Sequence, residues 1–304
     1  MSLKSKLKQL CNDRNSLLRK RQSLNQFSKR SKELVSKKPL LSFDGNEQYR
    51  HKIVDHIKHD LNTAVRLSKI LFIAGFGSRR KCDQLISSGA VKVNGKIAEL
   101  GLKVSSSDKV FVYNKLIESN INNFTPRIIL YNKPMQEIVS RNKLDNKTTV
   151  FEKIPLIKNN QSFIAIGRLD YNSSGLLVFT NCGNLAHNMM HPKFAVKRAY
   201  MVRVFGNILN SEQIQEMLAG IQLEDGLGCF ESVVSIGQNE GLNHWYKVVT
   251  VEGRNHFVRK MFAYFNLQVN RLIRVQFGSI YLPKKLKMGM YYELSNVEVK
   301  NILF

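Results

Sequence analysis

A single carboxylate stands out in the sequence as a group that could do chemistry. Asp170 lies in the polar segment GRLDYNSSGL, residues 167–176, between two runs that are typical of strands. An aspartate in such a loop often serves only as a turn former, because its side chain bonds to nearby backbone amides. A carboxylate in this position can also act as a nucleophile that forms a covalent intermediate. The loop by itself leaves both interpretations open.

The sequence offers little material for a metal site or a disulfide framework. The cysteines are far apart and form no Cys-x-x-Cys pair, so we predict neither a zinc site nor disulfides, and we expect a reducing compartment. A group of histidines has no second kind of ligand beside it, and we interpret these side chains as solvated. The residues concerned are Cys11, Cys82, Cys182 and Cys229, and His51, His56 and His59.

The charge balance indicates a polyanionic partner. The chain has 47 Lys and Arg against 23 Asp and Glu, a net charge of +24, and basic side chains that neutralise phosphates release condensed counterions. Residues 1–63 are a basic N-terminal extension and linker, for which we expect partial disorder. A loose basic arm, an RNA-binding helix and an organelle-targeting presequence all stay open for this segment. A membrane surface is the rival partner, but we find no apolar run long enough to span a membrane.

The elements that must position Asp170 belong to a region between residues 118 and 304. Short apolar runs alternate there with turns, and many connections are too short for crossover helices. We therefore expect an α+β domain with a mostly antiparallel mixed sheet. Strands are predicted at 128–131, 163–166, 176–179 and 200–204, and helices at 211–219, with Ser211 in the capping position, and at 255–264.

Residues 64–113 are expected to form a smaller domain with a helix pair and a hairpin. A second helix is predicted from Arg79 to Ile86, and Asn94-Gly95 is a strong signal for a tight turn between two strands. The apolar face of the first helix consists of Leu67, Ile70, Leu71 and Ala74.

A basic cluster, Arg79, Arg80 and Lys81, begins the second helix of this domain. The helix dipole slightly opposes positive charge there, whereas the free backbone N–H groups attract phosphate, so the cluster favours a binding role over a solvated surface. With the segment around Lys69 and the Asn94-Gly95 turn, the pattern resembles an S4 RNA-binding domain. The resemblance implies that the cluster and Lys69 bind structured RNA.

The loop around Asp170 resembles the catalytic signature of the RsuA/RluB group of pseudouridine synthases, with the RluB branch most similar. Together with the S4 match, the similarity runs over about residues 65–295 without large gaps. It includes TNCGNLAHNMMHP at 180–192, RAYMV at 198–202, EGRNHFVRKM at 252–261 and RLIRVQFG at 271–278. The resemblance implies a catalytic domain with a central basic cleft.

The same resemblance implies roles for individual residues. Asp170 would be the nucleophile, Tyr200 a stacking partner and candidate base, and Arg259 the ion-pair partner of the aspartate. A guanidinium beside a carboxylate favours the ionised form that attack requires. Arg254 and Asn255, from the segment that contains Arg259, are expected to contact the RNA.

The target uridine must leave its stack before a carboxylate can reach it. Arg168, two residues before Asp170, is placed to enter the vacated space or to hold a phosphate. Leu272 or Ile273 is expected to pack against the flipped uracil, although a plain core position fits either residue equally well. Pseudouridylation involves no redox step, so neither a cofactor nor a metal is expected.

Two positions depart from the family pattern. Gln136 stands where the family usually has a glycine, so its backbone would be strained if the position required a positive φ. Cys182 stands where an aspartate is usual, and a turn or cap hydrogen bond would then be lost at about 1 kcal/mol.

The sequence therefore predicts site-specific isomerisation of uridine to pseudouridine in ribosomal RNA, in the large subunit or its assembly intermediate. The alternative is a non-catalytic RNA-binding factor of ribosome assembly that has the same fold. We expect a cytoplasmic monomer whose partner is rRNA, with no membrane and no small-molecule cofactor.

Overall fold

The structure is a computed structural model, and it describes residues 64–74, 76–77, 79–105, 107–117, 126–144, 146–155, 163–237 and 241–303. The predicted basic extension at 1–63, with its three histidines, lies outside the described residues. In the described part of the chain, no helix is long and apolar enough to cross a membrane.

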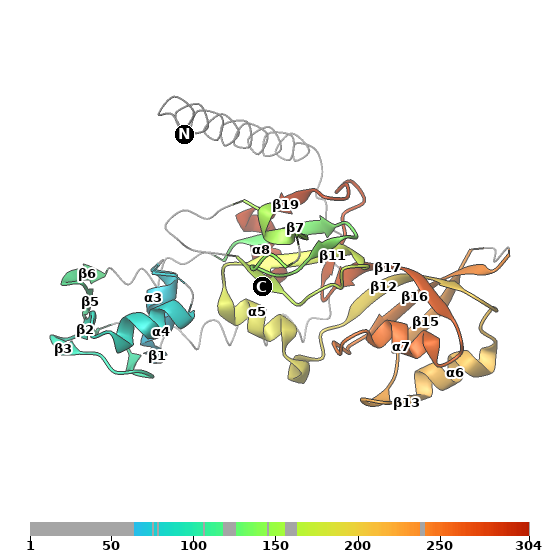
Figure 1. Cartoon of the computed structure of the whole chain (residues 1–304), viewed down its shortest axis with the longest axis horizontal. Helices are drawn as coiled ribbons and strands as arrows, with labels where there is room; N and C mark the ends of the chain where they lie inside the picture. Colours follow the sequence, from blue (N-terminus) through green and yellow to red (C-terminus); the bar gives the residue numbers. More distant parts are fainter. Residues whose placement is uncertain are drawn as a thin grey trace, which may run out of the picture. The chain divides into compact units, whose positions relative to one another are not determined.

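The smaller domain packs two helices against a small antiparallel sheet (Figure 1). Leu67, Ile70 and Leu71 are buried as predicted, and they share a core with Cys82 and Val91. The helices are α3 (Leu67–Ile73) and α4 (Arg79–Ser87). The strands are β1 (Val65–Arg66), β2 (Val91–Val93), β3 (Lys96–Ile97), β4 (Lys103–Val104), β5 (Val110–Val112) and β6 (Lys115–Ile117).

The hairpin between β2 and β3 turns at the predicted dipeptide. Asn94 and Gly95 both have positive φ, 51° and 85°, which is the backbone that a two-residue type I′ turn requires. The helix pair and the hairpin of this domain are thereby confirmed.

The larger domain is built on one sheet that is antiparallel except at its centre. Within the described residues, the sheet has the order β15-β16-β12-β17-β11-β7-β19, and β11 and β17 form its parallel pair. The predicted α+β class with a mostly antiparallel mixed sheet is confirmed. The strands are β7 (Ile128–Lys133), β10 (Ile164–Ile166), β11 (Ser174–Thr180), β12 (Arg198–Phe205), β15 (Ser232–Ile236), β16 (Asn243–Thr250), β17 (Gln268–Phe277), β18 (Ile280–Tyr281) and β19 (Tyr291–Glu293).

Short strands and helices border this sheet. Two of the helices, α6 and α7, lie near β15, β16 and β12 (Figure 1), and buried side chains of α7 share one core with those strands. The helices are α5 (Gly183–Met190), α6 (Ser211–Ala219), α7 (Phe257–Ala263) and α8 (Asn296–Leu303), with 3-10 turns η2 (Val150–Glu152) and η3 (Pro192–Phe194). The short strands are β8 (Glu137–Ile138), β9 (Thr148–Thr149), β13 (Ile221–Leu223) and β14 (Gly226–Gly228).

Two details of the helix predictions were wrong. Asn210, not Ser211, caps α6, because its side chain accepts from the amide of Gln213 in a reciprocal capping box. The helix predicted to begin at Asn255 begins at Phe257, because His256 has a left-handed backbone (φ 54°) that cannot continue a helix backwards.

Both departures from the family pattern have structural consequences. Cys182 is the N-cap of α5 and its side chain makes no cap hydrogen bond, so the expected loss of a cap is confirmed. Gln136 has a φ of 67°, the left-handed backbone that glycine tolerates best. Its amide donates to the carbonyl of Tyr171 at 2.8 Å, so this strained turn supports the loop that carries Asp170.

We predict that Gln136→Gly stabilises the protein. The substitution removes a non-glycine residue from a left-handed backbone and so relieves strain of about 1–2 kcal/mol. The greater chain entropy of glycine in the unfolded state offsets part of this gain. We expect the free energy of unfolding to rise by about 0.5–1 kcal/mol. Urea unfolding measures the change. Gln222→Gly, in the ordinary backbone of β13, is the control and should instead destabilise; equal effects at the two positions would contradict the strain.

Candidate active site

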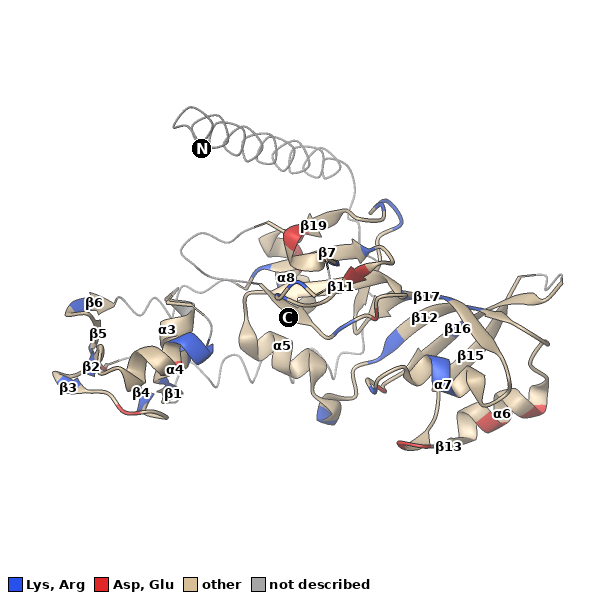
Figure 2. Cartoon of the chain, in the orientation of Figure 1, with Lys and Arg blue, Asp and Glu red and all other residues tan. Residues whose placement is uncertain are grey.

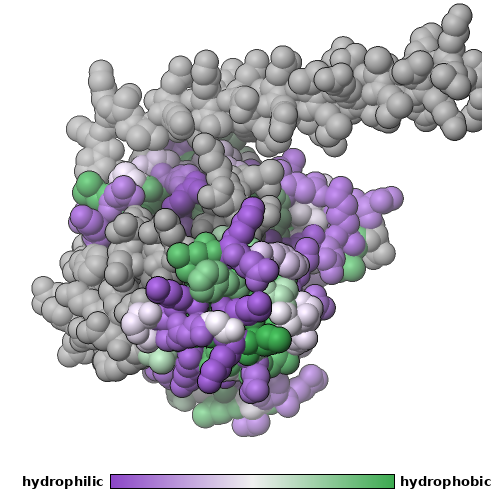
Figure 3. Space-filling model, turned by 90° about the vertical axis from the view of Figure 1, so that its left-hand side faces the viewer, coloured by the Kyte–Doolittle hydropathy of each residue, from purple (hydrophilic) through white to green (hydrophobic). Residues whose placement is uncertain are grey.

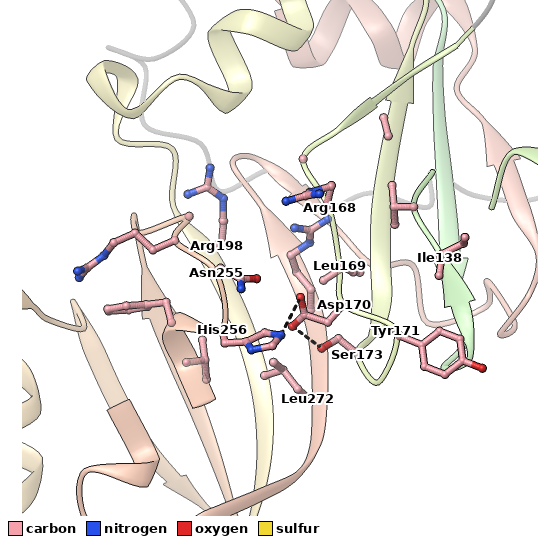
Figure 4. Close-up of a pocket in the computed structure, with 18 of the residues that line it drawn as sticks. Ile138, Arg168, Leu169, Asp170, Tyr171, Ser173, Arg198, Asn255, His256 and Leu272 are labelled. Carbon is pink, nitrogen blue, oxygen red and sulfur yellow. Dashed lines mark hydrogen bonds and ion pairs between the residues drawn. The ribbon is translucent and has the colours of Figure 1, made fainter. Parts of the chain in front are cut away.

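A cavity of about 820 Å³ opens beside the central strands of the larger domain. Most of its wall comes from the loop 167–173 before β11, the facing strands β12 and β17, and residues 252–258 at the start of α7. Residues of the segment 138–144, with Phe151, Ala165 and Met190, complete the lining. Figure 4 shows side chains from these segments pointing into one space. Segments that are distant in sequence therefore meet around Asp170.

Asp170 is held on the wall of this cavity with its carboxylate partly exposed. The Oγ of Ser173 donates to its Oδ2 at 3.4 Å, and the Nε2 of His256 lies 3.6 Å from its Oδ1 (Figure 4). The amide of Ser173 also donates to the Asp170 carbonyl at 3.1 Å. The side chain of Asp170 is 34% exposed, so a molecule in the cavity can reach it.

A buried lysine holds the backbone of the same loop from beneath. Lys133 is fully buried, and its ammonium donates to the carbonyls of Asp170 (3.1 Å), Ser173 (2.9 Å) and Pro134 (2.9 Å). Burial lowers the pKa of Lys133 to about 8, although the charges of Glu137 and Asp170 oppose this shift. The lysine ties the end of β7 to both ends of the turn that presents the carboxylate.

The pairing of β12 with β17 decides which strand residues face the cavity. Tyr200 lies opposite Arg274, and Val202 lies opposite Leu272, and directly paired residues share a face of the sheet. Tyr200, Leu272 and Arg274 line the cavity. Ile273 points to the other face, because side chains alternate along a strand, so Leu272 rather than Ile273 is placed to contact a base.

Arg274 is a buried charge in the middle of this arrangement. It is only 2% exposed, its Nε donates to the carbonyl of Leu176 at 2.8 Å, and its Nη2 has no partner among the described residues. Burial lowers the pKa of the guanidinium, and the neighbouring Tyr200 and Asp170 oppose this shift. The cation therefore lies within electrostatic reach of both expected catalytic side chains.

Close approach of two strands fixes the place of Arg274. Gly175 of β11 pairs with Arg274 of β17 in the parallel ladder, and a Cβ at Gly175 would overlap the Arg274 backbone. The φ of Gly175 is also positive, at 99°. The glycine of the SSGL motif is thus required by both space and conformation.

Arg259 does not form the ion pair that the sequence predicts. Its guanidinium donates to the carbonyls of Val269 at 2.7 Å and Asn172 at 3.1 Å, and within the described residues it makes no salt bridge with Asp170. Two backbone carbonyls occupy the guanidinium, so Arg259 bonds to the backbone of the loop that carries Asp170 and not to the Asp170 carboxylate. Arg274 is the arginine beside Asp170 and Tyr200.

Two of the three residues expected to contact RNA at this cavity stay open to solvent. Arg168 and Asn255 are exposed and line the cavity (Figure 4). Arg254 also lines it, but its guanidinium forms salt bridges with Glu252 and Asp225, both at 3.1 Å. Its further donors go to the carbonyls of the turn after β13, so Arg254 braces the β13–β14 hairpin.

The basic residues predicted in the smaller domain lie at the start of α4 and on α3. Arg79, Arg80 and Lys81 are exposed and Lys69 is half-buried, and Figure 2 shows the basic start of α4. Hydrophilic side chains predominate on the described face of this domain in Figure 3, with apolar patches between them. This surface suits a hydrated, charged partner.

Three residues were not singled out in the sequence: His256 and Arg274, which line the cavity, and Lys133, which holds the Asp170 loop from beneath. Arg274 had a recognisable signal, a cation between Ile273 and Val275 in a strand run, because such a residue is buried only where partners exist. Lys133, the last residue of its strand after Asn132, had none. No sequence signal marks His256. Among the described residues, no group of three or more His, Cys, Asp or Glu side chains gathers as a metal site would require.

Comparison with known proteins gives a family to this geometry. Residues 127–264 match the model of the RNA pseudouridylate synthases, and residues 65–110 match that of the S4 domain. Ribosomal large subunit pseudouridine synthase B of Buchnera aphidicola subsp. Acyrthosiphon pisum is 39% identical over 78% of this chain and 95% of its own length.

The chain belongs to the RNA pseudouridylate synthase family.

Two further comparisons agree with this assignment, one in sequence and one in fold. Ribosomal large subunit pseudouridine synthase B of Yersinia pestis is 43% identical over 75% of this chain and 72% of its own. A crystal structure of a pseudouridylate synthase has a TM-score of 0.53 at 24% identity, and it covers 79% of this chain and 100% of its own. That likeness concerns the fold.

We predict that Lys133→Met destabilises this pseudouridine synthase. The substitution leaves buried carbonyls without their donor, and we expect a loss of about 3 kcal/mol in the free energy of unfolding at pH 7, measured in urea. Lys284→Met, at an exposed position, is the control and should change stability little.

The loss should also depend on pH. The folded pKa of Lys133 is about 8, below that of about 10.4 in an unfolded chain. Between these values the unfolded state binds more protons, so the stability of the wild type rises with pH relative to Lys133→Met. A constant difference from pH 7 to 10 would contradict the lowered pKa.

Proposed function

We propose that this enzyme isomerises uridine to pseudouridine at a specific site in ribosomal RNA, in the large subunit, with Asp170 as nucleophile. The observation that carries the proposal is the position of the Asp170 carboxylate, partly exposed on a cavity that Tyr200 and the buried Arg274 also line. Relatives whose names specify the large ribosomal subunit support this choice of substrate.

The reaction needs a carboxylate that can attack and then leave. The N1–C1′ bond breaks, the uracil turns, and a C5–C1′ bond forms while C5 loses a proton and N1 gains one. Asp170 attacks C1′ or C6, or assists proton removal from the sugar. The positive charges of Arg274 and Lys133 lie within electrostatic reach of the Asp170 carboxylate.

The flipped base is expected to lie between Tyr200 and Leu272. Both side chains are mostly buried, at 9% and 6% exposure, and both line the cavity, so an aromatic face and an aliphatic side chain are available to a planar base. The cavity of about 820 Å³ falls in the usual range for pockets that enclose small molecules. Arg168, at the exposed rim, would fill the space that the uridine leaves.

Unstacking the uridine costs a few kcal/mol, which contacts elsewhere must offset. The exposed cluster of Arg79, Arg80 and Lys81 would supply phosphate contacts at a distance from the chemistry. We further propose that the enzyme works as a cytoplasmic monomer with rRNA as its partner. The cysteines Cys82, Cys182 and Cys229 form no disulfide, which supports a reducing compartment.

We predict that Asp170→Asn abolishes the reaction but not RNA binding. Unmodified rRNA labelled with tritium at uracil C5 reports the reaction, because C5 loses its hydrogen, and the amide cannot act as a nucleophile. Filter binding measures the affinity for RNA. Tritium release by Asp170→Asn at the wild-type rate would refute the nucleophile, and binding without release by the wild type would favour the assembly factor.

We predict that the triple variant Arg79→Gln, Arg80→Gln, Lys81→Gln weakens rRNA binding and flattens its dependence on salt. Each lost phosphate contact lowers the slope of log affinity against log salt by about 0.7–0.9, so the slope should fall by about 2. The control replaces Lys96, Lys109 and Lys115, which are exposed on the sheet side of the same domain. Equal slopes for the two triple variants would remove the α4 cluster from the RNA contact.

A further inference from the structure

His256 faces Asp170 from the opposite wall of the cavity. Its Nε2 lies 3.6 Å from Oδ1, and the Oγ of Ser173 lies 3.4 Å from Oδ2, so each carboxylate oxygen has one side-chain donor beside it (Figure 4). The nearby cations make other bonds: the ammonium of Lys133 binds backbone carbonyls, and the Nε of Arg274 binds a backbone carbonyl.

The backbone of His256 has an unusual conformation for its place in the fold. It is the N-cap of α7 with φ 54° and ψ 20°, and its side chain makes no cap hydrogen bond. An ordinary N-cap has an extended backbone and a side chain that accepts from the helix amides. A left-handed backbone is disfavoured for residues other than glycine, and such residues are frequent at functional sites. Here the imidazole faces the carboxylate instead of the helix end.

We propose that His256 is a positioning residue for Asp170. Its Nε2–H donates to Oδ1 and, with Ser173 on Oδ2, holds the carboxylate plane at the orientation needed for attack. This inference rests on the proposed role of Asp170 as nucleophile. Both contacts are longer than an ideal hydrogen bond, and contacts of this kind shorten when a substrate fills the site. Substrate also expels water, and a hydrogen bond is stronger where the local dielectric is low.

Two substitutions distinguish the effect of the side-chain contact from the effect of the backbone conformation. His256→Gln places an amide nitrogen about where Nε2 lies, whereas the amide of His256→Asn stops one bond shorter. Asn tolerates the left-handed backbone better than Gln. We therefore expect His256→Asn to be at least as stable as His256→Gln in thermal unfolding.

The order of activity should be the reverse of the order of stability. The single-turnover rate of tritium release at saturating rRNA should fall by roughly 10- to 100-fold in His256→Asn, the size expected for a lost hydrogen bond to a charged group. His256→Gln should recover part of this rate, and the affinity for rRNA should stay within about twofold in both variants. His191→Gln, at an exposed histidine outside the cavity lining, is the control and should keep the wild-type rate.

Three results would overturn the proposal. If the single-turnover rates of the two variants rank in the same order as their thermal stabilities, the loss of activity arises from the backbone and not from the side-chain contact. Unchanged rates in both variants would show that the contact does not matter. Weaker rRNA binding with a wild-type rate at saturation would make His256 an RNA contact.

A measurement without substrate separates this proposal from the proposed function. The imidazole resonances of His256, assigned with His256→Gln, should shift in Asp170→Asn because the neighbouring charge is removed. Unmoved resonances would overturn the contact. If the resonances shift but the wild type is inactive on rRNA, the proposed function is contradicted while the contact between His256 and Asp170 stands.

Discussion

The architecture of the site depends on the burial of one guanidinium. Arg274 is 2% exposed at the centre of the sheet, where an isolated charge would be expensive unless partners compensate it. Compensation comes from the carbonyl of Leu176 and from the ring of Phe277, whose centroid lies 4.9 Å from the guanidinium carbon. The neighbouring Tyr200 and the charge of Asp170 add to it. This cation would destabilise a core made of apolar side chains alone. Its burial here therefore requires polar residues around the cavity.

This requirement connects the strand pairing with the loop that carries Asp170. Because Gly175 lets β11 approach β17 closely, the loop before β11 lies within reach of Arg274. Lys133 then fixes the backbone of that loop through three carbonyls. The carboxylate of Asp170 is thus held through its backbone by a rigid sheet, while its side chain stays available to a substrate.

Two residues with strained backbones lie beside the loop that carries Asp170. Gln136 bonds to the loop from a left-handed turn, and His256 faces it from another. Each such conformation costs of the order of 1–3 kcal/mol and persists only where the surrounding structure enforces it. The loop and its strained neighbours are in place before a substrate arrives, and such preorganisation is how a protein stabilises charge without reorganisation during a reaction.

The sequence by itself predicted the fold class, because turn residues and apolar periodicity are local properties of the chain. Its resemblance to a known family predicted that Asp170 and Tyr200 lie around one cavity, which both of them line. It could not determine which arginine faces Asp170, since Arg259 and Arg274 are equivalent in charge and differ only in the acceptors that folding brings to each. The sequence also did not distinguish Leu272 from Ile273 as the residue that contacts the base. The register of β12 on β17 places Leu272 on the face of the cavity. Long-range pairing decided both points, because the acceptors of each arginine and the strand register arise from packing between segments that are distant in the sequence.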